Sequence, residues 1–205
     1  MNRKKCLTAG ICGILAGILT AYLRSFSPNS FLSISDIAVY LGFWVFTTGL
    51  AVLAASSAGE ASVLSGLYLI FMCIAYYVYI DLQTGQFYWT HLIFWGAAAV
   101  VCVLYARPLW RAVREPDRTS IFFTGIPLVI LLTEAGQLGR NFLLYRTHLL
   151  QPVFDLAAAA TLLFLFCRTK RNRILTALFA VLLTAFLLFL IWLVNRILLT
   201  VNQSL

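Results

Sequence analysis

The hydrophobic positions of this chain fall in seven long runs separated by short polar segments. The runs extend over about 6–23, 35–55, 61–82, 89–110, 119–138, 149–167 and 174–199. A helix of about 20 apolar residues can cross the hydrocarbon core of a membrane. A transmembrane β-barrel would show alternating segments of about ten residues, and these runs do not alternate. The pattern predicts an all-α fold: a polytopic bundle of seven transmembrane helices in a single domain over residues 1–205, with six spans as the alternative.

The first run follows the basic segment Asn2-Arg3-Lys4-Lys5 and so resembles a signal peptide in outline. No small-x-small cleavage site precedes Arg24, and six further hydrophobic runs follow. We therefore interpret this run as a retained first span.

Small residues recur at every fourth position of the first span, namely at Ala9, Gly13, Gly17 and Ala21. Residues at this spacing share one helix face, and a face of small residues lets another helix approach closely within a membrane. We expect this face to pack against a neighbouring span of the same chain. The alternative is that this face docks a separate membrane-protein partner, which would make the chain a structural or accessory subunit of a membrane complex.

Composition excludes a soluble globular domain. Of the 205 residues, 62% are hydrophobic and 11% are charged, against roughly 45–50% and about 25% in soluble domains. Too little polar surface would remain to cover a soluble globule of this size.

The basic residues predict the orientation, because loops rich in Lys and Arg stay in the cytoplasm. One side of the seven-span arrangement carries Arg3, Lys4, Lys5, Arg107, Arg111, Arg114, Arg118, Arg168, Lys170, Arg171 and Arg173. The other side carries Arg24, Arg140, Arg146 and Arg196. We predict a multi-pass protein of the inner cell membrane, with its N-terminus in the cytoplasm and its C-terminus outside.

With the acidic residues included, the predicted inner side holds the whole net charge of +8 and the outer side is neutral. A basic inner side suits anionic lipid. The lipid bilayer is therefore the expected partner, and the charge gives no reason to expect nucleic-acid binding.

None of the five cysteines lies in a predicted outer loop, and no CxxC or Cys/His spacing occurs. We predict no disulfide, no metal site and no cofactor. The chain also lacks a GxSxG elbow, an HExxH motif and a glycine-rich phosphate loop. No catalytic residue is predicted; a non-enzymatic role is favoured, and an envelope enzyme is the alternative.

The segment from Glu134 to Asp155 is where polar side chains enter two consecutive hydrophobic runs. Glu134, Gln137 and Asn141 are spaced to share one helix face, as are Gln151 and Asp155. At about 1.5 Å per residue, Glu134 and Asp155 lie at similar depth in the outer part of the membrane. Ionisable residues within spans usually face protein or a watery cavity and are candidates for function.

Other spans place polar residues at the same level: Asp36, Tyr40, Tyr77, Asp81, His91, Trp95 and Arg196. With the Glu134–Asp155 segment, including Arg140 and Arg146, they predict an outward-facing vestibule that binds a small polar or zwitterionic ligand. The alternative is that the carboxylates and arginines pair as structural salt bridges. For His91 and His148 an interfacial role is favoured over metal ligation, and Tyr88 is interpreted as an interfacial anchor.

The series Glu134-x-x-Gln137, Arg146 and Asp155 resembles the E-x-x-Q…R…D pattern of VanZ-like membrane proteins. That resemblance implies a role facing the cell envelope. The small-residue face of the first span and the outer polar level also resemble the substrate-binding subunits of vitamin transporters, which implies binding of a transported solute.

Overall fold

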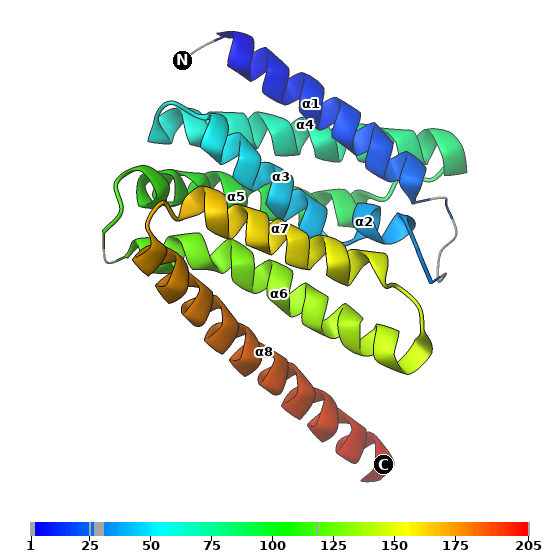
Figure 1. Ribbon diagram of the computed structural model, residues 1–205. Helices are drawn as coiled ribbons and strands as arrows, with labels where there is room; N and C mark the ends of the chain where they lie inside the picture. The colour runs from blue at the N-terminus through cyan, green and yellow to red at the C-terminus, as the bar shows by residue number, and fades with distance from the viewer. Residues whose placement is uncertain (1–2, 25, 27–30, 118, 205) are drawn as a thin grey trace.

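The computed structural model describes residues 3–24, 26, 31–117 and 119–204, so Asn2, Pro28 and Arg118 lie outside the described residues. Over these ranges the regular structure is helical (Figure 1). The helices are α1 (Arg3–Leu23), α2 (Ser35–Val39), α3 (Leu41–Ala54), α4 (Ala58–Thr84), α5 (Trp89–Arg114), α6 (Ser120–Tyr145), α7 (Leu150–Phe166) and α8 (Lys170–Ser204).

Five of the described helices, α1, α4, α5, α6 and α8, are long and apolar enough to cross a membrane. They adjoin one another in the order α1–α4–α5–α6–α8. The shorter apolar helices α3 and α7, of 14 and 17 residues, pack over the middle of this row (Figure 1). The protein is therefore an all-helical bundle of the kind found in membranes.

The run predicted as a single second span is divided in two. Tyr40 is extended (φ −88°, ψ 165°), which ends α2 and lets α3 begin at Leu41. No proline lies at this break; instead, a carboxylate oxygen of Glu134 accepts the backbone N–H of Leu41. An acceptor from another helix thus satisfies one of the N–H groups that every helix start leaves open.

The small-residue face of α1 packs against α4. A Cβ atom added at Gly13 would lie 3.1 Å from the carbonyl carbon of Tyr68 and closer still to the carbonyl oxygen of that residue. One built at Gly17 would lie 3.0 Å from the amide nitrogen of Tyr76. Ala21 is buried and Ala9 is partly buried. The face is thus occupied within the chain, so a separate partner would need another surface of α1.

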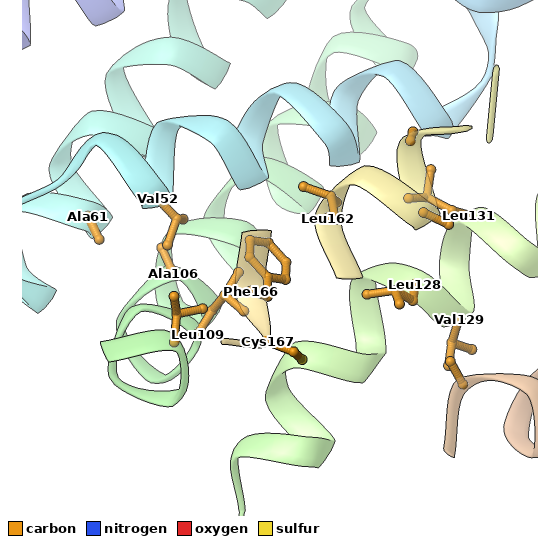
Figure 2. Close-up of a cluster of buried hydrophobic side chains, with 14 of the residues drawn as sticks. Val52, Ala61, Ala106, Leu109, Leu128, Val129, Leu131, Leu162, Phe166 and Cys167 are labelled. Carbon is orange, nitrogen blue, oxygen red and sulfur yellow. The ribbon is translucent and has the colours of Figure 1, made fainter. Parts of the chain in front are cut away.

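The main hydrophobic core lies where α3, α5, α6 and α7 meet the start of α4 (Figure 2). Its labelled side chains are Val52, Ala61, Ala106, Leu109, Leu128, Val129, Leu131, Leu162, Phe166 and Cys167. Gly49 of α3 allows Leu162 and Phe166 of α7 to pack closely against this helix.

A proline in α6 explains one link between α5 and α6. Pro127 lacks the N–H that would pair with the carbonyl group of Phe123, four residues earlier. The hydroxyl group of Tyr105 on α5 donates to this carbonyl oxygen instead.

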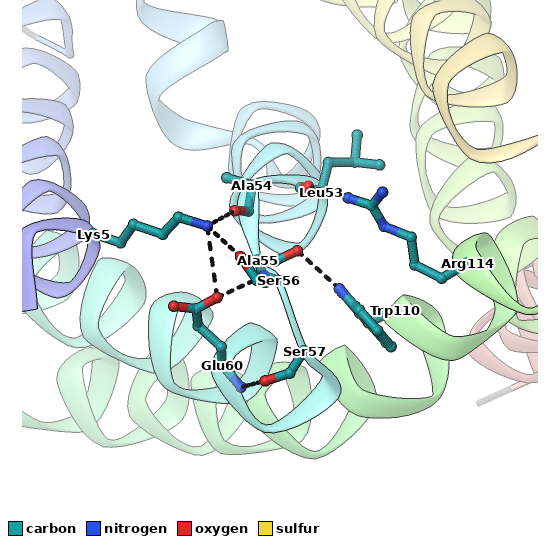
Figure 3. Close-up of polar contacts among 9 residues, drawn as sticks. All are labelled: Lys5, Leu53, Ala54, Ala55, Ser56, Ser57, Glu60, Trp110 and Arg114. Atoms are coloured by element: carbon teal, nitrogen blue, oxygen red, sulfur yellow. Dashed lines mark hydrogen bonds and ion pairs between the residues drawn. The ribbon is translucent and has the colours of Figure 1, made fainter. Parts of the chain in front are cut away.

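Polar contacts fix the end of α3 (Figure 3). The Nζ of Lys5 lies 2.8 Å from the carbonyl oxygen of Ala54 and 3.6 Å from Oε2 of Glu60, which also accepts the N–H of Ser56. The indole N–H of Trp110 donates to the carbonyl oxygen of Ala55 at 3.0 Å. These bonds satisfy carbonyl and amide groups that the helix end leaves open.

Candidate functional site

The start of α3 meets α6 and α7 at a buried polar cluster. Oε1 of Glu134 on α6 lies 2.8 Å from the backbone nitrogen of Leu41. Gln151 and Asp155 on α7 are fully buried, and Nε2 of Gln151 donates to Oδ1 of Asp155 at 2.8 Å. We call Glu134, Gln151 and Asp155 the carboxyl cluster.

Glycine is required where α3 passes this cluster. A side chain at Gly42 would lie 2.8 Å from Nε2 of Gln151 and 3.0 Å from Cγ of Asp155, with Oδ1 of Asp155 closer still. The first turn of α3 therefore lies directly against α7, and its adjacent residues Leu41 and Gly42 contact Glu134 and Asp155 respectively.

Three buried oxygens of the cluster have no hydrogen-bond partner among the described residues: Oε2 of Glu134, Oε1 of Gln151 and Oδ2 of Asp155. Neither carboxyl group has a basic side chain within ion-pair distance in this part of the chain. The pairing with arginine that sequence offered as an alternative is therefore not found for Glu134 or Asp155. Each acceptor left without a donor costs about 1–3 kcal/mol.

Asp36 is separately paired. Its Oδ2 lies 2.8 Å from Nδ1 of His148, and its Oδ1 accepts a hydrogen bond from Ser33. The amide of Leu149 also donates to the carbonyl oxygen of Phe31. These contacts attach α2 to the loop between α6 and α7, and they give His148 a structural partner.

A second polar site is a cavity of about 280 Å³ beside the start of α3, which we call the aromatic cavity. Its lining comes from the residue that follows α1, from α3 and α4, and from the start of α5. It consists of Arg24, Trp44, Tyr76, Tyr77, Tyr88, His91 and Trp95. The rings of Trp44 and Trp95 are stacked with centroids 5.4 Å apart. Nη1 of Arg24 lies 3.4 Å from the hydroxyl oxygen of Tyr76, and His91 packs edge-on against Tyr88.

The two sites share the first turn of α3. Leu41 and Gly42 contact the carboxyl cluster, whereas Trp44 lines the aromatic cavity. A shift of this turn would therefore change both sites together.

A larger cavity, of about 530 Å³, lies between α1, α3 and α4. Its walls are mostly apolar, with Lys4 and Lys5 at one end and Phe43 and Leu50 among its lining. Of its polar side chains, Lys5 already contacts Ala54 and Glu60, and the hydroxyl group of Thr47 donates to the backbone of its own helix.

Among protein families, the model of a family of unknown function, DUF6518, matches residues 2–197. The chain belongs to this family. No curated protein and no solved structure matches it. Nothing in these comparisons supports the resemblance to VanZ-like proteins.

In this DUF6518 chain the residues predicted to form one vestibule are distributed over several places. Glu134, Gln151 and Asp155 come together, Asp36 pairs with His148, and His91 lines the aromatic cavity with Tyr77 and Trp95. Gln137, Arg140, Asn141 and Arg146 are exposed, and Arg146 lies over the ring of Phe142. Asp81 is half-buried near the end of α4, and Arg196 lies over Trp192 on α8, which diverges from the bundle (Figure 1).

Sequence reasoning missed Trp44, Tyr76 and Gly42 and gave Arg24 no role in binding. Trp44 and Tyr76 sit in apolar runs where aromatic residues are expected, so composition alone does not distinguish them. Gly42 was the available signal of the helix break, because glycine lowers helix propensity and Gly42 lies two residues after Tyr40.

Proposed function

We propose that this DUF6518 chain is a multi-pass protein of the inner cell membrane that binds a small anionic or zwitterionic ligand with a planar apolar part in the aromatic cavity. It would act as a transporter or as a substrate-binding subunit, with seven spans and a cytoplasmic N-terminus. The observation that carries the proposal is Arg24 at a cavity of about 280 Å³ lined by five aromatic side chains and His91.

The chemistry of the lining supports this ligand class. An arginine guanidinium presents a fork of N–H donors that matches a carboxylate or phosphate. Tryptophan and tyrosine rings offer flat apolar faces on which a planar group can stack. Ligand cavities typically combine apolar walls with a few polar groups that fix orientation.

The charge distribution supports an outward-facing cavity. Arg24 follows α1, whose first turn contains Arg3, Lys4 and Lys5. If that basic turn lies in the cytoplasm, as the positive-inside rule predicts, α1 delivers Arg24 to the outer face. Tyr88 and His91 at the start of α5 then lie on the same side.

Ligand binding can be measured through the tryptophans, because Trp44 and Trp95 both line the cavity. The purified protein in nanodiscs would be titrated with benzoate, nicotinate and phenylalanine while its tryptophan fluorescence is recorded. We expect saturable quenching by at least one probe. Arg24→Gln should weaken it about tenfold or more, since a hydrogen bond to a charged group contributes about 1.5–3 kcal/mol.

Arg107→Gln is the matched control, because Arg107 is an exposed arginine on the opposite end of α5 from the cavity. A loss of binding in Arg140→Gln with Arg24→Gln unaffected would instead favour the vestibule expected from sequence. Absence of saturable quenching by all three probes, or equal affinity in Arg24→Gln, would overturn the proposal.

A further inference from the structure

The carboxyl cluster has a charge that the described side chains do not balance. Glu134 and Asp155 lie against adjacent residues of the first turn of α3, and neither has a basic partner within ion-pair distance among the described residues. The N-terminus of α3 contributes a partial charge of about +0.5. This partial positive charge already faces Glu134, because the N–H of Leu41 donates to the carboxylate of Glu134. Two ionised carboxylates would still leave a net negative charge in a site where Asp155 is fully buried, which is strongly unfavourable.

The hydrogen-bonding pattern indicates what is needed. The three atoms without a partner, on Glu134, Gln151 and Asp155, are all oxygens. Gln151 is fully buried and already directs its amide nitrogen at Asp155. Oxygen acceptors that lack donors are satisfied by a proton or by a hard cation, which prefers oxygen ligands.

We propose that Glu134, Gln151 and Asp155 form a binding site for one small monovalent cation, either a proton shared by the two carboxyl groups or a sodium ion. One positive charge together with the α3 N-terminus brings the site close to neutrality. The site is distinct from the aromatic cavity, whose lining contains none of these three residues.

The remaining titratable groups near the site do not supply this charge. Tyr40, at the break between α2 and α3, donates its backbone N–H to the carbonyl oxygen of Asp36 and carries no positive charge. Asp36 adds negative charge of its own and is paired with His148. The cation must therefore come from solution.

The proposal also assigns a role to the α2–α3 break. Glu134 and Asp155 of the cation site contact Leu41 and Gly42. Trp44, in the same helical turn, lines the aromatic cavity. Occupation of the cluster would therefore fix the cavity wall. This coupling rests on the proposed function, whereas the cation site itself does not.

Two measurements without ligand test the site and distinguish the ions. The first is the thermal unfolding temperature of the detergent-solubilised protein as NaCl replaces choline chloride at constant ionic strength. A sodium site predicts that this temperature rises with sodium concentration, since a ligand that binds only the folded state stabilises it by mass action. The second is the infrared band of a protonated carboxyl group, which a shared proton predicts in sodium-free buffer.

Asp155→Asn and Glu134→Gln should each abolish the sodium response or the infrared band, and Glu115→Gln, at an exposed position, should leave both unchanged. The wild-type measurements remain decisive if a variant fails to fold. A wild-type protein with neither a sodium response nor the band would overturn the proposal, as would a response that survives both substitutions. Ligand binding to the aromatic cavity is measured separately, so failure of either proposal can be recognised.

Discussion

Replacing Gly13 by alanine adds a methyl group where α1 meets the backbone of α4. The added carbon would lie 3.1 Å from the carbonyl carbon of Tyr68 and 3.2 Å from the amide nitrogen of Met72. Favourable contacts between carbon atoms lie at about 3.5–4.0 Å. Because the obstructing atoms belong to a helix backbone, they cannot move aside as a flexible side chain could, and α1 must shift.

The magnitude follows from comparison with a glycine that has free space. Overpacking a well-packed contact costs about 1–3 kcal/mol. Gly59, in the first turn of α4, has no atom within 4 Å of the added carbon, so Gly59→Ala should stabilise by up to about 1 kcal/mol through its effect on the unfolded chain. We expect Gly13→Ala to be less stable than Gly59→Ala by about 1–3 kcal/mol.

Equilibrium unfolding in mixed detergent micelles, followed by circular dichroism, measures this difference. Gly17→Ala should behave like Gly13→Ala, since its added carbon would lie 3.0 Å from the amide nitrogen of Tyr76. If Gly13→Ala is as stable as Gly59→Ala, the close α1–α4 contact is wrong and the small-residue face becomes available to a separate partner.

Three further predictions concern polar contacts. Tyr105→Phe should lower the free energy of unfolding by about 1–3 kcal/mol, because the carbonyl oxygen of Phe123 loses its donor. Lys5→Met should lower the same quantity by about 1–3 kcal/mol, since the buried carboxylate of Glu60 loses its cation. Asp117→Asn should weaken the pH dependence of stability in acid, because hydrogen bonds from hydroxyl groups at the start of α6 lower the pKa of Asp117 below its ordinary value of 3.8.

Each of these predictions has a measurement that can contradict it. Unfolding titrations should show no loss for Tyr145→Phe or Lys170→Met at exposed positions. If these controls lose as much stability as Tyr105→Phe and Lys5→Met, the losses do not come from the hydrogen bond and ion pair named here. For Asp117 a lowered pKa means that the stabilisation is present above pH 3.8 and is lost as pH falls through the folded-state value. Identical acid unfolding profiles for Asp117→Asn and the wild type would contradict this.

The positions of the helices could be predicted because membrane-length helices are encoded by the length of apolar runs. The break at Tyr40 could not, since the feature that supports it is a carboxylate on α6, some 93 positions away in sequence. Equal depth suggested that Glu134 and Asp155 could meet, and the structure places them against adjacent residues of α3. Depth alone does not give the rotation of each helix, so Gln137 and Arg140 were assigned to the same site although they are exposed.

The shortness of α3 has an electrical consequence. Its 14 residues rise about 21 Å, about 9 Å less than a hydrocarbon core of about 30 Å, and its last turn is fixed by Lys5 and Trp110. If that turn lies at the inner face, a cation reaching Glu134 and Asp155 from outside crosses about a third of the membrane field. One charge crossing the whole field gains about 2.3 kcal/mol per 100 mV. Cation affinity would then change about three- to fourfold per 100 mV, so membrane voltage would shift the occupancy of the cluster.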